Sequence, residues 1–247
     1  MASLAHPIDA TVTMVRPSPY LSDSAFLKLY ERWPDYRLEY DAPEQEVVMA
    51  PPTEPETGER NSEITAQLHG WNRSHRWGRV LDSSSGTRLP NRSIRAVDAS
   101  WIARDRFDRA MAQRGDDTYP VLCPDFVIEL RSPSDRLPPL KRKMQESIDN
   151  GALLACLVDP IDQTVTIYRP GTTPESLAAP SSVAGEGPVE GFLLDLTAIW
   201  PASRSATSAP SADPPPAPSP APPIASSAPA RPQAPMGQSV RSAGLFH

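Results

Sequence analysis

The stretch CPDFVIELRSPSDRLPPLKRKMQESIDNGA, residues 123–152, carries the clearest pattern in the chain. Within DFVIELR (125–131), the apolar residues Phe126, Ile128 and Leu130 fall on every second position. Side chains two apart share one face of a β-strand, so this spacing predicts a strand with one fully apolar face.

The residues that follow predict a helix and a second strand. SPSD at 132–135 offers a helix start, and Leu140, Met144 and Ile148 recur every four residues. Gly151 then ends the helix, and the apolar run at 153–158 predicts a buried strand. We therefore expect a crossover helix between two strands.

Weaker patterns extend this core in both directions. We expect helices after Ser22 or Ser24, from Asn61 or Ser62 to before Gly78, and over 105–115, and strands at 36–40, 46–50, 79–83, 87–89, 94–103 and 164–169. Residues 192–200 are expected to close the domain. Residues 51–58 (PPTEPETG) are expected to form a loop. This order predicts an α/β or α+β fold with a mixed sheet.

Proline separates the folded part of the chain from its ends. The sequence has 31 prolines among 247 residues, and 12 of them lie in 201–247, together with 11 alanines and 9 serines. Such a segment cannot bury enough apolar surface to offset its ordering entropy, so a disordered tail is expected there. We expect a flexible leader at 1–20 and one domain over 21–200.

Charge, cysteine content and hydropathy narrow the function classes. The formal net charge of −6 argues against broad, non-specific clamping of nucleic acid, which needs a basic surface. Two cysteines make no disulfide framework. We find no signal-peptide pattern, and the longest apolar run (152–158) is too short to span a bilayer. A cytoplasmic protein without membrane contact is expected.

Two carboxylates stand in segments that otherwise appear buried. Asp98 lies in AVDASW and Glu129 lies in VIEL. A buried carboxylate is costly unless it is paired or binds a metal. The alternative is that each faces solvent, or that the two pair with Arg95 and Arg131 respectively. They can meet only if their strands are neighbours.

Lys143 is the third candidate, because it precedes Met144 and can reach from the rim of the buried helix face towards Glu129. The alternative is that KRK (141–143) is simply a solvated basic stretch. Two carboxylates and a lysine suit hydrolysis of a phosphodiester. The carboxylates would hold Mg²⁺ or Mn²⁺, and the ammonium would position water or stabilise developing charge. No glycine-rich phosphate loop, GxSxG elbow or CxxC pair is present.

With VDASWIARDRFD (97–108), the 123–152 stretch, LVDP (157–160) and TVTIYRPG (164–171), the chain resembles the Uma-two family of restriction endonuclease-like proteins, relatives of the PD-(D/E)XK nucleases. The resemblance runs from about Ser22 to Trp200 and includes ETGERNSEITAQL (56–68) and DSSSGTRLPN (82–91). It implies an α/β fold with a restriction-endonuclease-like mixed sheet flanked by helices.

The resemblance also implies roles for single residues. Asp98 matches the family's metal-binding aspartate, and Glu129 matches the acidic residue of the E-x-K element. Position 131 is Arg, and the lysine instead matches Lys143 on the following helix, as in this family. Glu39 matches a recurrent glutamate of the N-terminal hairpin and is a weaker candidate. Metal ligands would be Asp98 and Glu129, and the catalytic set would add Lys143.

Two positions depart from the family pattern. Ser147 stands where a tyrosine is usual, and Cys156 stands where tryptophan is frequent. Losing a ring costs about 2–4 kcal/mol of packing if nothing compensates, although neither position is a proposed metal ligand. The site could therefore be competent in a less stable protein, or the chain could be drifting towards inactivity.

Two functional hypotheses follow. The first is a metal-dependent DNA endonuclease, with phosphate contacts from the arginines at 88, 92, 95, 104 and 106, unless these serve only solubility. Cutting both strands would favour a homodimer. The second is an inactive protein of nuclease fold that binds nucleic acid or a protein partner, with the tail presenting a polyproline segment.

Overall fold

The computed structural model describes residues 12–14 and 21–201. The predicted tail from 202 onward and most of the predicted leader lie outside these residues. Within the leader, β1 (Val12–Met14) pairs with a strand of the domain. In the described part of the chain, no helix combines the length and apolar character needed to cross a membrane.

A six-stranded mixed sheet forms the centre of the domain. Its strands, in spatial order, are β11 (Glu175–Ala178), β10 (Thr164–Tyr168), β9 (Leu154–Asp159), β8 (Phe126–Leu130), β7 (Ala99–Ala103) and β4 (Gly78–Asp82). β8 and β9 are parallel and are joined through α4 (Leu137–Asp149), whereas every other pair in this sheet is antiparallel. The predicted mixed sheet and crossover helix are confirmed.

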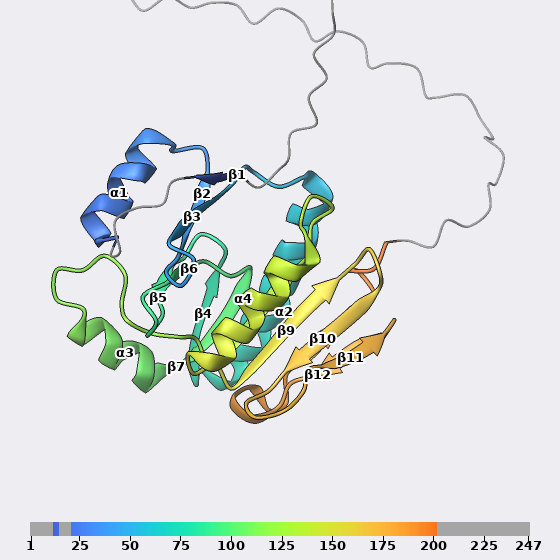
Figure 1. The fold of residues 1–247 in the computed structure, drawn as a ribbon. Coiled ribbons are helices and arrows are strands. Elements are labelled where there is room, and N and C mark those ends of the chain that lie inside the picture. The colour runs from blue at the N-terminus through green and yellow to red at the C-terminus, as the bar shows by residue number, and fades with distance from the viewer. Residues whose placement is uncertain (1–11, 15–20, 202–247) are drawn as a thin grey trace, which may run out of the picture. The chain divides into compact units, whose positions relative to one another are not determined.

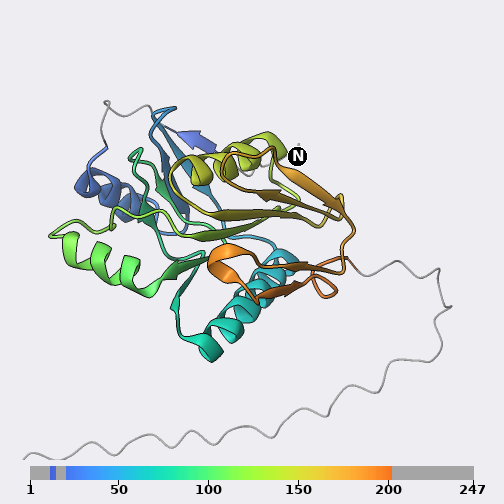
Figure 2. The same ribbon diagram turned by 90° about the horizontal axis from the view of Figure 1, so that it is seen from below.

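The alternation in β8 decides which side chains face which helix. Phe126, Ile128 and Leu130 pack in the main core with residues of α2 (Pro55–His75), and Val127 packs on the other face beneath α4. Figures 1 and 2 show α2 and α4 on opposite faces of the sheet. Glu129 shares the parity of Val127, so its side chain lies on the α4 face.

A second, antiparallel sheet carries the N-terminal hairpin. Its spatial order is β1, β3 (Glu46–Ala50), β2 (Arg37–Asp41), β6 (Ile94–Arg95) and β5 (Thr87–Arg88). α1 (Asp23–Arg32) packs on it through buried Phe26, and its first turn is capped by the Ser22 hydroxyl. The predicted capping and the predicted hairpin are both present.

One predicted strand is divided between the two sheets. Residues 94–103 form β6, in which Ile94 pairs with Tyr40, and β7, in which Ala99 pairs with Ile128. Between β6 and β7, the Ala96 amide donates to the Glu39 side-chain carboxylate at 3.2 Å instead of to a backbone carbonyl of a neighbouring strand. Asp98 therefore lies not in the middle of a strand but at the crossing from one sheet to the other.

Two further boundaries differ from the predictions. α2 begins at Pro55, so the expectation of a loop through residue 58 was wrong for its last four residues. Proline is well suited to the first turn of a helix, where its missing N–H has no partner to lose. α3 spans Arg104–Gln113. Near the end of the domain, Leu193–Asp195 (β13) pairs with β12 (Ser182–Ala184), and a short 3₁₀ turn at Gly187–Val189 lies between them.

Candidate active site

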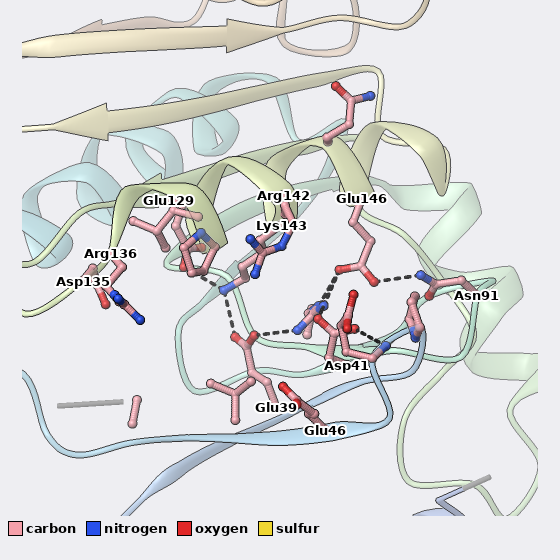
Figure 3. A pocket seen from close by; sticks show the side chains of 18 of the residues that line it. Glu39, Asp41, Glu46, Asn91, Glu129, Asp135, Arg136, Arg142, Lys143 and Glu146 are labelled. Carbon is pink, nitrogen blue, oxygen red and sulfur yellow. Dashed lines mark hydrogen bonds and ion pairs between the residues drawn. The ribbon is translucent and has the colours of Figure 1, made fainter. Parts of the chain in front are cut away.

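Lys143 lies at the centre of a buried charge cluster between the two sheets (Figure 3). Its ammonium Nζ donates to Glu129 Oε1 at 2.7 Å, to Glu39 Oε1 at 2.8 Å and to the Ala96 carbonyl at 3.3 Å. All three ammonium donors are thereby used. Lys141 is exposed whereas Lys143 is buried, so the KRK stretch is not uniformly solvated.

Glu129 has one carboxylate oxygen with no partner. Its Oε1 accepts from Lys143, but Oε2 is buried and receives no hydrogen bond from the residues that the structure describes. Burial, reinforced by the negative charges of Asp98 and Glu39, outweighs the nearby Lys143 and raises the pKa of Glu129 to about 7. A buried oxygen that is not hydrogen-bonded costs stability, so it marks a position that a ligand can satisfy.

Asp98 is held at the crossing between the sheets by two donors. The Leu130 amide donates to Oδ2 at 2.9 Å, and Arg37 Nη1 donates to Oδ1 at 3.1 Å. Because Leu130 directly follows Glu129, Asp98 and Glu129 lie at the same end of β8. Asp98 does not pair with Arg95, and Arg131 pairs with Asp159 rather than with Glu129.

Glu39 completes the cluster from β2. Burial alone would raise its pKa, but Lys143, Arg95 and Arg37 together lower the pKa to about 2. Burial alone would lower the pKa of Lys143. The negative charges of Glu129 and Glu39 outweigh this effect and raise its pKa, so the ammonium stays charged. Glu39 and Glu129 thus share Lys143, but their pKa values shift in opposite directions, because Arg95 acts on Glu39 whereas Asp98 and Glu39 add negative charge beside Glu129.

Arg95, predicted as a phosphate contact, is buried and bound by carboxylates. It contacts Asp41 at 2.7 Å, Glu146 at 2.5 Å and Glu39 at 3.5 Å. Glu146 also accepts from the side chains of Asn91 and Ser93. Arg95 therefore ties β2 and β6 to α4, the helix that carries Lys143.

The other predicted phosphate contacts lie elsewhere. Arg88 pairs with Asp23, Arg106 pairs with Asp125, and Arg104 donates to the Arg76 carbonyl. Arg92 lines a separate cavity of about 700 Å³. None of these four lines the cavity that contains Lys143, where the structure instead places Arg37, Arg136 and Arg142. Arg37 was missed from the sequence, because its contact with Asp98 spans 61 positions.

The cluster opens into a cavity of about 750 Å³ between the β2–β3 hairpin and α4. Glu39, Glu129 and Lys143 lie among the lining residues, and Pro139 and Leu140 contribute apolar surface. Eight carboxylates and five cationic side chains line it in all. A small phosphate-bearing ligand or a divalent cation can reach the buried carboxylates from this side.

The residues of the cluster fit a hard divalent cation only if water and substrate phosphate complete its coordination shell. Among the described residues no group of three or more His, Cys, Asp or Glu side chains is arranged to hold a metal ion. Mg²⁺, however, commonly binds one or two carboxylates and completes its shell with water and substrate phosphate. Glu129 lines the cavity and its Oε2 accepts no hydrogen bond from the described residues, whereas both oxygens of Asp98 already accept one, so a cation that also bound Asp98 would compete with Arg37 for Oδ1.

Ser147 and Cys156 do not leave the void that the loss of rings predicts. Ser147 is buried, donates to the Lys143 carbonyl at 3.0 Å, and borders a cavity of only about 10 Å³. Such a void costs about 0.2 kcal/mol, so the surrounding side chains have compensated for the missing ring. Cys156 is buried in the main core. Among the described residues, no hydrogen bond joins the side chain of Ser147 or Cys156 to Asp98, Glu129 or the Lys143 ammonium.

Comparison with known proteins adds to this geometry. The model of the Uma2 family, described as "Putative restriction endonuclease", matches residues 24–197. A solved structure, a "putative nuclease belonging to DUF820" from Anabaena variabilis, is similar with a TM-score of 0.58 and 21% sequence identity. The alignment covers 73% of this chain and 96% of that one, and it supports the fold. No curated protein matches.

Proposed function

Because the chain belongs to the Uma2 family, we propose that it is a metal-dependent DNA endonuclease that hydrolyses phosphodiester bonds at the Lys143 cluster. One observation carries the proposal: Glu129 Oε2 is buried without a partner while Oε1 is held by Lys143. A site arranged only for stability would satisfy both oxygens. A site that takes a cation leaves one oxygen available.

Each side chain has a distinct role in this proposal. Asp98 and Glu129 supply oxygen ligands for Mg²⁺ or Mn²⁺, which when bound would polarise the phosphodiester and acidify a water. Glu39 keeps the Lys143 ammonium charged and in place. Lys143 then directs a proton towards the attacking water or a phosphoryl oxygen, in exchange for its bond to Glu129.

DNA is the proposed substrate on two grounds. The matching family is described as a "Putative restriction endonuclease" family, and the similar solved structure is described as that of a "putative nuclease". Arg136 and Arg142 line the cavity beside the cluster, and arginine presents forked donors that suit phosphate. Such a protein would act in the cytoplasm, in agreement with the expectation from the sequence.

The test is a nicking and cleavage assay on supercoiled and linear DNA with Mg²⁺ or Mn²⁺. We expect cleavage by the full chain and loss of cleavage in Asp98→Asn, Glu129→Gln and Lys143→Met. Glu175→Gln is the matched control, because it removes an exposed carboxylate on β11, outside the cavity. It should cleave as the parent does.

The outcomes separate the two hypotheses. Cleavage that persists in all three variants would show that the cluster is not the active site. A parent that is silent with every metal and DNA form, yet still binds DNA, would favour the non-catalytic nuclease-fold protein instead.

A further inference from the structure

Arg37 forms an ion pair with Asp98, one of the two carboxylates proposed to hold the cation. Its Nη1 lies 3.1 Å from Asp98 Oδ1, and its side chain is 34% exposed whereas that of Asp98 is 6% exposed. Arg37 is two residues before Glu39 on β2, so the two side chains share the face that looks into the cavity. The Arg37 guanidinium therefore contacts the buried Asp98 carboxylate, while the rest of the Arg37 side chain lies at the rim of the cavity.

The other cations of the cavity are placed differently. Lys143 and Arg95 are buried and each is bound by at least two carboxylates. Arg142 is exposed, and its side chain makes no hydrogen bond or ion pair within the described residues. Arg37 alone among the five lining cations contacts Asp98 in the part of the chain that the structure describes.

We propose that Arg37 is a positioning residue that holds Asp98 in the metal-free protein and transfers to a substrate phosphate when the cation takes Asp98. This inference rests on the proposed function and adds to it the means by which cation and substrate are bound together. It follows that Arg37 opposes cation binding in the absence of DNA and supports DNA binding in its presence.

Physical arguments support both halves of the transfer. A deeply buried carboxylate is strongly destabilising without a counter-charge, and Arg37 supplies that charge when no metal is bound. A cation that binds Asp98 takes over this task, and the guanidinium is then released at the rim of the cavity. Its forked donors match a phosphate as well as a carboxylate, so the released group has a partner when a nucleic acid strand enters.

The first experiment measures Mn²⁺ binding to the full chain by calorimetry without DNA. Arg37→Met keeps much of the side-chain volume and removes the charge, and we expect it to bind Mn²⁺ about tenfold more tightly. Arg142→Met is the matched control, because it removes the same charge from the same cavity without touching Asp98. We expect a change of about twofold or less for it.

The second experiment measures binding of a phosphorothioate-linked DNA duplex at saturating Mn²⁺. Here Arg37→Met should weaken DNA binding by about five- to tenfold, although it binds the metal more tightly. Opposite signs in the two experiments would not arise from a purely structural defect, which lowers both affinities. Arg37→Lys keeps a charge but loses the fork, so it should fall between parent and Arg37→Met in both measurements.

Each result has a definite meaning. If Arg37→Met and Arg142→Met change Mn²⁺ affinity equally, or if Arg37→Met weakens both metal and DNA binding, the inference is wrong. Those two results overturn the inference and leave the proposed function standing, whereas Asp98→Asn binding Mn²⁺ as tightly as the parent would overturn the proposed metal site and the inference with it. If no protein in the set binds Mn²⁺, both fail together.

Discussion

At the scale of single residues, the protonation of Glu129 would control cation binding at the proposed site. Burial raises the pKa of Glu129 to about 7, so around neutral pH its carboxyl exchanges between a protonated and an ionised form. Only the ionised form is a ligand. The neighbouring Glu39 has its pKa lowered to about 2 and stays ionised throughout.

The first prediction is that Mn²⁺ affinity falls as the pH drops below about 7. The proton and the cation compete for Glu129, so affinity should decrease by about tenfold per pH unit well below its pKa. Calorimetric titration between pH 5.5 and 8.5 measures this. Glu129→Gln should show little metal binding and little of the pH dependence. A flat profile in the parent would contradict the assignment of Glu129 as a ligand.

The second prediction concerns the stability of the metal-free protein. The pKa of Glu129 is higher in the folded state than in the unfolded state, so its favourable contribution is present below about pH 4.5 and is lost as the pH rises through 7. Glu129→Gln should therefore raise the free energy of unfolding at pH 8, by a difference on the order of 2–3 kcal/mol, and change it little at pH 5.

Urea unfolding at the two pH values measures the effect of Glu129→Gln. Added Mn²⁺ should stabilise the parent and not the variant, because only the parent binds it. A variant that is less stable than the parent at both pH values would mean that the Lys143–Glu129 pair stabilises the fold more than burial of Glu129 destabilises it.

At the scale of elements, Arg95 fixes the position of α4 relative to the two-sheet framework. It is 7% exposed and contacts Glu39, Asp41 and Glu146, which come from β2 and α4. The negative charges of these three carboxylates outweigh the effect of burial and raise its pKa, so the guanidinium remains charged. Removing it leaves three carboxylates without their shared cation.

The third prediction is that Arg95→Met destabilises the protein by about 3–5 kcal/mol, the usual cost of removing one partner of a buried ion pair. Urea unfolding checks it. The double variant Arg95→Met/Glu146→Gln should recover part of the loss, because it removes one of the stranded charges. Additive losses in the double variant would show that Arg95 and Glu146 act independently.

The central elements were predictable from the sequence because their patterns are local. The period of two in β8 and of four in α4 placed the crossover unit, and the parity of Glu129 put it on the α4 face. The division of 94–103 was not predictable, because the run is buried almost throughout while its two halves pair with distant partners in opposite directions along the chain, Ile94 with Tyr40 and Ala99 with Ile128.

The candidate site was predictable only in part, for a similar reason. Lys143, Glu129, Asp98 and Glu39 stand out as charges in apolar surroundings or as matches to family motifs. Arg37 does not, because an arginine at the first position of a strand is ordinary. Its role depends on a contact with Asp98 that spans 61 positions, and a sequence carries no local sign of it.

At the scale of the whole molecule, acidity limits how the proposed endonuclease could bind DNA. The sequence carries a formal net charge of −6, and the cavity is lined by more carboxylates than cations. Of the five arginines predicted to contact phosphate, Arg88, Arg95 and Arg106 are paired with carboxylates. Few cationic side chains near the site therefore remain for DNA, and Arg37, Arg136 and Arg142 are the main ones.

The last prediction is a shallow salt dependence of DNA binding at fixed, saturating Mn²⁺. Each phosphate contact contributes about −0.9 to the slope of log affinity against log salt on B-DNA, so about three contacts give a slope near −3. Fluorescence anisotropy from 50 to 300 mM KCl measures it. Arg142→Met should make the slope shallower by about one contact, whereas Arg79→Met, on β4 outside the cavity, should leave it unchanged. A slope steeper than about −6 would require a basic surface that lies beyond this cavity, and DNA would then be held mainly by residues outside the candidate site.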